Sequence, residues 1–295
     1  MKAIAVCTNL DDLDIGGLDQ PETCKKYPGS GWLPQLARQG ADRGYHVFSG
    51  SQALLLAEKE IIQYANIQVI QEEQNRHAGT LISRGADASV VFCQESPIYT
   101  PHFYDALPAL KRQFKAQVLF DGGTHHLHFP SFDAEEPLLE LVPWDDRRPM
   151  VMVMSAKHYS LLGDLWKDSP SWQTAMKTQL HDARFQALEK YKPDLYGKGF
   201  PQSIPDGKKI DVIRNYRYAV CYENGAYPGY ITEKIIDCFV AGVIPIYQGA
   251  PDLERYIPRS AHDPENMHEF LRSPTGHRYS YQGFARDMLD ILEIQ

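Results

Sequence analysis

Short apolar runs of strand length alternate along this chain with longer amphipathic stretches, and no other feature limits its fold so strongly. Residues 32–43 are typical of a helix because Leu33 and Leu36 share one side, and Gly44 follows as a helix end. Such alternation is typical of βα units packed around mostly parallel sheets. We therefore predict an α/β fold, with strands in the first half at residues 2–7, 45–48, 88–93 and 116–120.

The pattern is interrupted between residues 121 and 148, where glycine, histidine, proline and acidic residues replace the periodic segments. A fresh apolar run at residues 150–154 resumes it. We therefore predict two domains with a ligand cleft between them, outside the carboxyl ends of the strands. The predicted division is residues 1–148, residues 149–275, and a final amphipathic helix in 276–295 that packs back across the junction. Elements expected in the second domain are a helix at about 170–191, a strand at 218–222, a helix from Thr232 and a strand at 243–247.

The balance of charges excludes some classes of partner. The chain has 295 residues, with 30 Lys and Arg against 38 Asp and Glu, and its net charge is −8. A general electrostatic grip on a nucleic acid or an anionic membrane is therefore not expected. Residues 177–217 are an exception, with nine basic against five acidic residues. This segment is interpreted either as a solvated basic face or as a pocket for a diphosphate.

The sequence predicts no membrane span. The longest candidate, Ile235–Tyr247, falls short of the ~20 residues that a span requires, and it contains Asp237 and Pro245. The first residues run directly into a predicted core strand, without the features of a secretory leader. We therefore expect a soluble, cytoplasmic protein, either free or peripheral at the inner membrane face.

Neither the cysteines nor the histidines predict a metal site. The five cysteines are widely spaced and lack a Cys-x-x-Cys pair, which favours structural or free thiols. His125, His126 and His128 are close in sequence, but no Asp, Glu or Cys pattern completes a zinc set. A polar loop that lines the cleft and an ordinary loop are the other interpretations. Asp12 and Asp14 form a short Asp-x-Asp far from the other motifs, so no cofactor and no divalent metal is expected.

The most informative motif spans residues 222–234 and reads Tyr-Glu-Asn-Gly-Ala-Tyr-Pro-Gly-Tyr-Ile-Thr-Glu-Lys, between a predicted strand and a predicted helix. Thr232 is a suitable N-cap, so the free N–H groups of the first helical turn face the cleft, where they suit a phosphate. Lys234 adds a full positive charge at that place. Glu233 is interpreted either as an acid that matches the helix dipole or as an acceptor for a ribose diol.

This motif is followed by Ala-Gly-Val-Ile-Pro-Ile-Tyr-Gln-Gly-Ala-Pro at residues 241–251, and together they resemble the signature of family 10 glycosyltransferases, the fucosyltransferases. The Asp-Leu-Tyr-Gly-Lys-Gly turn at 194–199 resembles the segment that precedes it in that family. The resemblance covers about residues 150–260, with only short islands in the first domain. It implies a GT-B fold, in which two Rossmann-like domains face a central cleft. The second domain then binds a GDP-sugar and the first holds the acceptor.

Carried over position by position, the resemblance implies four donor-binding residues in the motif. Asn224 and Tyr230 would line the diphosphate or the sugar. Glu233 would hold the guanosine ribose, and Lys234 would hold the phosphates.

Two further donor-binding residues are implied outside the motif. Arg184, on the helix before the Asp-Leu-Tyr-Gly turn, would neutralise the leaving diphosphate, a role that suits its fixed charge and forked donors. A surface arginine is the alternative. Lys157 resembles a donor-site lysine of the family, although Ala156 replaces the asparagine that precedes it there.

An inverting transferase needs a base that removes the proton of the acceptor hydroxyl, and this base should come from the first domain. Glu95 fits, because it follows the predicted strand at 88–93 and begins a Glu-Ser-Pro that resembles the family's proposed base. An ordinary glutamate at a strand end is the alternative. Tyr99 is a candidate for stacking on acceptor sugars, and His126 and His128 are candidates for contacts with acceptor hydroxyls. Core packing is the alternative for Tyr99.

The resemblance therefore implies an inverting, metal-independent glycosyltransferase of the bacterial type, which moves L-fucose from GDP-fucose to a hydroxyl of an oligosaccharide, polysaccharide or lipid-linked glycan. The same fold and mechanism would serve another donor, a GDP-hexose or GDP-heptose. A nucleotide-dependent oxidoreductase is an alternative from another class, although no Gly-x-Gly-x-x-Gly follows the first strand. A non-catalytic sugar-binding module is the third alternative.

Overall fold

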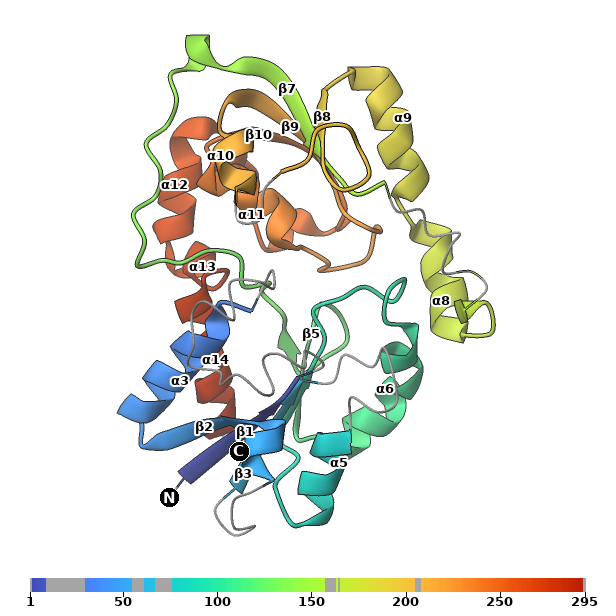
Figure 1. Ribbon diagram of the computed structural model, residues 1–295, viewed down its shortest axis with the longest axis vertical. Coiled ribbons are helices and arrows are strands. Elements are labelled where there is room, and N and C mark those ends of the chain that lie inside the picture. Colours follow the sequence, from blue (N-terminus) through green and yellow to red (C-terminus); the bar gives the residue numbers. More distant parts are fainter. Residues whose placement is uncertain are drawn as a thin grey trace.

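The computed structural model describes residues 2–8, 30–54, 61–66, 76–156, 163, 165–204 and 208–293. They form two α/β lobes, which lie one above the other along the long axis of the molecule (Figure 1). Each lobe is built on its own parallel sheet. The predicted α/β class, with two domains built around mostly parallel sheets, is confirmed.

The first sheet has six parallel strands in the order β2-β1-β3-β4-β5-β6. Because β1 lies between β2 and β3, residue Ile4 pairs with Val47 on one side and Ile62 on the other. The strands are β1 (Lys2–Cys7), β2 (Tyr45–Ser49), β3 (Ile61–Asn66), β4 (Val90–Phe92), β5 (Ala116–Leu119) and β6 (His125–His126).

Helices cover both faces of this sheet. On one face α3 (Trp32–Asp42) and the last helix, α14 (Tyr281–Glu293), lie side by side, and on the other face lie α5 (Arg76–Ser83) and α6 (Pro101–Gln113) (Figure 1). A short helix, α4 (Gly50–Ala53), directly follows β2. Successive side chains of a strand point to opposite faces, so each buried strand contributes to two cores. Ile4 and Val6 pack with α3 and α14, whereas Ala5 and Cys7 pack with α5 and α6.

The second sheet has the order β10-β9-β7-β8, and all of its strands are parallel. From β7 the chain first adds β8 on one side and then β9 on the other, so the strand order reverses between β7 and β9. Such a reversal opens a crevice at the carboxyl ends of the two strands. The strands are β7 (Arg148–Val153), β8 (Asp194–Tyr196), β9 (Tyr216–Tyr222) and β10 (Ile244–Gln248).

Two helical layers enclose the second sheet. On one face α9 (His181–Tyr191) packs Ala187 against Met152 and Val220. On the other face α11 (Glu233–Val240) packs Ile235 and Ile236 against the sheet. Other helices of this part of the chain include α10 (Lys209–Ile213), α12 (Pro264–Arg272) and α13 (Pro274–His277), and short 3-10 turns lie at Trp144–Asp146, Leu253–Arg255 and Arg259–His262.

The continuous helix predicted at about 170–191 is wrong. The structure has α8 (Pro170–Ala175), a 3-10 turn at Met176–Thr178 and then the separate α9. Between them the chain pairs with the loop after β9, because the Leu180 N–H donates to the Asn224 carbonyl at 3.0 Å and the Ala226 N–H donates to the Thr178 carbonyl at 2.8 Å. This pairing draws the connecting residues out of a helical conformation. As a result α8 lies beside α6 of the first lobe (Figure 1).

Four of the five cysteines, Cys7, Cys93, Cys221 and Cys238, are buried free thiols, as the sequence predicted, and Cys24 lies outside the described residues. Across the described ranges, no helix combines the length and the apolar character needed to cross a membrane.

Candidate active site

The loop that follows β9 is held in place by a buried carboxylate. Glu223 has 0% exposure, and its Oε1 accepts the Thr232 backbone N–H at 2.9 Å. Its Oε2 accepts the Thr232 hydroxyl at 2.8 Å. The Thr232 oxygen in turn accepts the Lys234 backbone N–H at 3.5 Å, so the predicted N-cap of α11 is confirmed. Glu223 therefore fixes the start of α11 at the crevice between β7 and β9.

Lys234 is surrounded by oxygen atoms of its own chain. Its Nζ lies 2.9 Å from Thr232 Oγ1, 3.2 Å from Glu223 Oε2 and 3.4 Å from Glu233 Oε1. Burial alone would lower the pKa of Lys234, but the carboxylates of Glu223 and Glu233 raise this pKa above its usual range. The side chain is therefore a permanent cation, and 23% of its surface remains exposed.

Glu233 stays ionised for the complementary reason. Burial would raise the pKa of Glu233, but the ammonium groups of Lys234 and Lys209 outweigh it and hold the pKa at about 2. Lys209 comes from α10 and pairs with Asp237 at 2.6 Å, one turn further along α11. The start of α11 thus carries the ionised carboxylate of Glu233 beside the ammonium group of Lys234.

Arg184, on α9, joins the same loop from the other side of the sheet edge. Its side chain is buried, and Nη2 donates to the Tyr222 carbonyl at 3.0 Å and to Asn224 Oδ1 at 2.5 Å. Asn224 Nδ2 then donates to the Tyr230 hydroxyl at 3.3 Å. Within the described part of the chain, Nε and Nη1 of Arg184 have no hydrogen-bond partner. Among the described residues, the guanidinium is thus held through Nη2 alone.

Glu95 faces Lys234 and Glu233 from the first lobe. It lies in the turn after β4, and its own carbonyl accepts the Tyr104 hydroxyl at 2.8 Å, which fixes the turn. Burial raises the pKa of Glu95 to about 7; the charge of Lys234 opposes this shift and that of Glu233 reinforces it. A carboxyl group with such a pKa accepts and releases protons near neutrality, which is what a general base requires.

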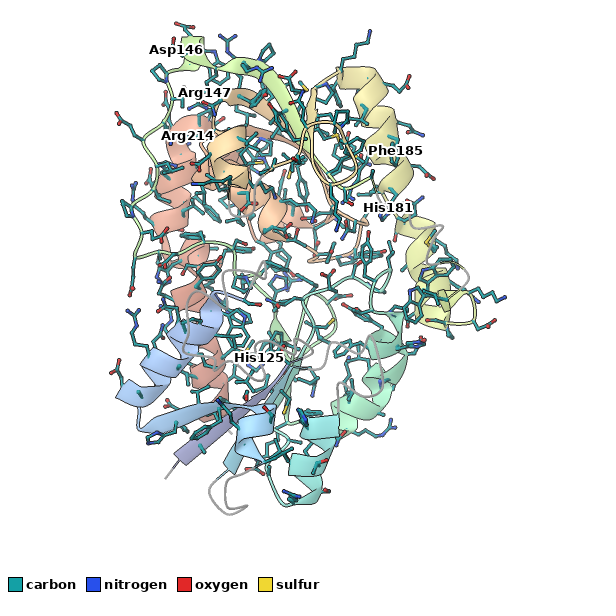
Figure 2. All side chains as sticks on the ribbon, in the orientation of Figure 1. His125, Asp146, Arg147, His181, Phe185 and Arg214 are labelled. Carbon is teal, nitrogen blue, oxygen red and sulfur yellow. The ribbon has the colours of Figure 1, made fainter. Side chains whose placement is uncertain are left out.

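Polar contacts join the two lobes beside the site. The Tyr99 hydroxyl lies 2.9 Å from His181 Nε2, where α9 begins and the chain leads back to α8 (Figure 2). Asp105 of α6 accepts the Ser169 hydroxyl at 2.6 Å and the Ser171 N–H at 3.0 Å, and so caps α8. These contacts hold the first lobe against α8 and against the start of α9, the helix that carries Arg184.

Aromatic contacts complete the junction. The Tyr230 ring, 2% exposed, packs edge-on against Phe120 with centroids 4.8 Å apart. His126 stacks on Tyr256 of the second lobe at 4.0 Å, and its Nδ1 lies 3.0 Å from the Phe120 carbonyl. Tyr230 therefore reaches the site through its hydroxyl group, while its ring is part of the interior.

The histidines differ in their surroundings. Burial lowers the pKa of His126 to about 4 and that of His128 to about 2, so both rings are neutral at physiological pH. His128 is only 6% exposed and packs against Tyr279, which argues against a contact with an acceptor. His125 is exposed and bonds to Thr124, in the first lobe and away from α9 (Figure 2).

The described ranges contain no cluster of three or more His, Cys, Asp or Glu that could hold a metal ion. Lys157, Asp12 and Asp14 lie outside the described residues. Of the residues predicted to bind the donor sugar nucleotide, the structure brings five together: Arg184, Asn224, Tyr230, Glu233 and Lys234. Glu95 lies opposite them in the first lobe.

Sequence reasoning missed Glu223, Lys209 and Asp237. Glu223 is a charged residue directly after the buried strand β9, and an acid at the end of an apolar strand is a signal that it has a partner. Lys209 and Asp237 are separated by 28 residues, so nothing local marks them as an ion pair.

Gly229 is required where the loop meets the first lobe. Its φ is +66°, and a Cβ atom there would lie 2.2 Å from the Phe120 carbonyl oxygen. We expect Gly229→Ala to lower the free energy of unfolding by about 3 kcal/mol, from left-handed strain and overpacking. Urea denaturation measures this. Gly79→Ala is the control, because a Cβ there meets nothing within 4 Å and helix propensity predicts a small gain in stability. Equal midpoints for the two variants would contradict the tight contact.

Comparison with known proteins finds glycosyltransferases. The family model "Glycosyltransferase family 10 (fucosyltransferase) C-term" matches residues 170–271. Alpha-(1,3)-fucosyltransferase 4 of Bos taurus is 35% identical over 82 residues, which is 26% of this chain and 21% of that protein. Alpha-(1,3)-fucosyltransferase FucT of Helicobacter pylori is 31% identical over 98 residues, 31% of this chain and 20% of that protein. The chain thus spans about one fifth of the length of the curated relatives it matches.

Solved structures with a similar chain course include a crystal structure of alpha1,3-fucosyltransferase with GDP. It has a TM-score of 0.49 and 16% identity, over 99% of this chain and 81% of that chain. An alpha-glucosyltransferase in complex with UDP and a 13-mer DNA has a TM-score of 0.47 and 12% identity, over 99% of both chains. The resemblance to family 10 that the sequence motifs indicated is confirmed by the family match over residues 170–271.

Proposed function

We propose that this chain transfers L-fucose from GDP-fucose to a hydroxyl group of a glycan acceptor. The premise is the match of residues 170–271 to the C-terminal domain of family 10 glycosyltransferases. One observation carries the proposal. Two fixed cations, Arg184 and Lys234, converge at the end of the second sheet, and a carboxyl group with a pKa of about 7, Glu95, faces them from the first lobe. Arg184 and Lys234 can therefore stabilise a negatively charged leaving group on one side of the site, and Glu95 can accept a proton on the opposite side.

On the donor side, each group suits one part of a GDP-sugar. Arg184 presents forked donors to the diphosphate, and Lys234 adds its charge at the start of α11, whose N–H groups favour an anion. Glu233, ionised and partly exposed, suits the two hydroxyls of the ribose. Asn224 and the hydroxyl of Tyr230 continue this surface toward the sugar.

This placement supports an inverting reaction. Glu95 removes the proton of the acceptor hydroxyl as its oxygen attacks the anomeric carbon, and the bond from that carbon to the diphosphate breaks on the opposite side. The configuration of the anomeric carbon is therefore inverted. The charge that develops on departing GDP is stabilised by Arg184 and Lys234, so we propose that no divalent metal is required.

The donor groups contact the nucleotide and the phosphates, so they would serve another GDP-hexose or GDP-heptose equally well. On the acceptor side, Tyr99 lies near Glu95 and His126 lies at the junction with the second lobe, and we propose that an oligosaccharide, polysaccharide or lipid-linked glycan enters there. We also propose that the protein acts in the cytoplasm or at the inner face of the membrane.

Thermal unfolding with added ligands tests the proposal. A ligand at one hundred times its Kd adds about 2.7 kcal/mol to stability, so the melting temperature should rise with GDP and with GDP-fucose. A larger rise with GDP-mannose or another GDP-sugar would keep the mechanism and change the donor. A rise with NAD and not with GDP would favour an oxidoreductase. Binding of GDP-fucose without GDP release in the presence of glycan acceptors would favour a sugar-binding module.

The rate should depend on pH through Glu95. This carboxyl group must be ionised to accept a proton, and its pKa is about 7. We therefore expect kcat/KM to fall about tenfold per pH unit below 7 and to level off above it. Initial rates of GDP release between pH 5 and 9 measure this profile. A break near pH 4.5, the ordinary value for glutamate, would contradict the buried setting of Glu95.

A further inference from the structure

We propose that Glu223 is a positioning residue for the donor site, which holds the Lys234 ammonium group where it meets the diphosphate. The proposal rests on the proposed function, because it assigns Lys234 to the phosphates. It adds a residue whose own side chain contacts no ligand: Glu223 has 0% exposure and acts through Thr232 and Lys234.

The two carboxylates beside Lys234 differ in exposure. Glu223 is fully buried and accepts two further hydrogen bonds, both from Thr232. Glu233 is 28% exposed and lies slightly further from Nζ, at 3.4 Å against 3.2 Å. Glu223 is thus a fixed partner, whereas Glu233 can exchange Lys234 for a ribose hydroxyl.

An ammonium group has three N–H donors, and this limits how Lys234 can bind a phosphate. Thr232 Oγ1 and Glu223 Oε2 occupy two of them from the protein interior. When Glu233 turns to the ribose, the third donor is released in a direction set by the other two. Glu223 and Thr232 therefore orient the Lys234 ammonium group. The conformational entropy of this side chain is lost during folding and not during binding.

The surroundings of Glu223 leave it little freedom. Its backbone N–H donates to the Gln248 carbonyl at 2.8 Å, and a Cβ atom on Gly249 would lie 2.5 Å from its Cγ. The loop after β10 therefore closes over the side chain of Glu223 and keeps the carboxylate directed at Thr232 and Lys234.

The test is the affinity for GDP, measured by isothermal titration calorimetry on four proteins: wild type, Glu223→Gln, Lys234→Met and the double variant. In Glu223→Gln, one end of the amide still accepts the Thr232 N–H, but the other end offers N–H groups to Lys234 and displaces it. We expect GDP to bind about tenfold more weakly, close to the loss of one charged hydrogen bond. Lys234→Met should weaken binding further, and adding Glu223→Gln to it should change nothing more.

That last comparison separates positioning from general support of the fold. If Glu223 acts through Lys234, the two substitutions are coupled and the double variant binds GDP like Lys234→Met. An equal loss from Glu223→Gln with and without Lys234 would overturn the proposal. Tighter GDP binding by Glu223→Gln would also overturn it, since Glu223 would then act only as a negative charge that repels the phosphates.

Two further variants guard the interpretation. Glu223→Asp keeps the charge and shortens the side chain by one methylene group. A positioning role predicts that this variant binds GDP more weakly, whereas a purely electrostatic role predicts no change in affinity. The same variant tests the proposal if Glu223→Gln fails to fold. Glu269→Gln, at an exposed position of α12, removes a negative charge elsewhere and should leave the affinity unchanged. If wild type does not bind GDP, the proposed function fails; if it does and Glu223→Gln binds equally well, only the role of Glu223 fails.

Discussion

Glu95→Gln is expected to lower kcat for sugar transfer about a thousandfold, while the Kd for GDP-fucose stays within about twofold of wild type. The amide has nearly the shape of the carboxyl group but cannot accept the proton of the acceptor hydroxyl. Glu95 lies in the first lobe, and the groups proposed to hold the donor all lie in the second, so their geometry should persist. Steady-state GDP release and calorimetric titration of GDP-fucose measure the two quantities. A variant that turns over at the wild-type rate would remove Glu95 from the mechanism.

The stability of the same variant provides a control against misfolding. Burial raises the pKa of Glu95 from 4.5 to about 7, so ionising this group costs folding free energy. Its contribution to stability is fully present below about pH 4.5 and is lost as the pH rises through 7. Glu95→Gln should therefore melt at a higher temperature than wild type at about pH 8.5, and this advantage should shrink on acidification. If Glu95→Gln melts below wild type both at pH 8.5 and after acidification, its loss of activity is structural.

Much of the fold could be predicted from local patterns. The apolar run Tyr218–Tyr222, the N-cap at Thr232 and the helix end at Gly242 are all signals within a few residues, and the structure has β9, α11 and the left-handed Gly242 there. The break between α8 and α9 could not be predicted in this way. It depends on backbone pairing of Thr178 and Leu180 with a loop about 45 residues later, and such pairing overrides helix propensity.

The candidate site shows the same division. Thr232, Glu233 and Lys234 stand in one motif, and their places at the start of α11 follow from helix geometry. The way in which the first lobe meets this motif does not follow from helix geometry. It depends on contacts such as Tyr99–His181, which joins residues 82 positions apart in different lobes. Tyr99 was a candidate for stacking on a sugar by residue type alone, and the structure adds that its hydroxyl group is already bonded to the helix that carries Arg184.

Arg184→Lys is expected to lower kcat about a hundredfold with a much smaller change in the KM for GDP-fucose, because charge develops on the diphosphate as the bond to the sugar breaks. The substitution keeps a positive charge but not the fork. In wild type, Nη2 donates to Asn224 Oδ1 and the Tyr222 carbonyl, while Nε and Nη1 have no partner among the described residues and are proposed to meet the diphosphate. A lysine has one side-chain nitrogen, which cannot occupy the position of Nη2 and those of Nε and Nη1 at the same time.

Arg112→Lys is the matched control for this loss, since Arg112 is an exposed residue at the end of α6, and it should leave both constants unchanged. A loss confined to KM in Arg184→Lys would mean that Arg184 binds the donor equally in the ground state and the transition state, and its part in bond breaking would fall. A loss in kcat that also appears in Asn224→Ala, which removes the acceptor for Nη2, would instead indicate that Arg184 works by holding the loop. In Asn224→Asp the carboxylate still accepts from Arg184, so a role in departure of the diphosphate predicts that this variant retains more of its rate than Arg184→Lys.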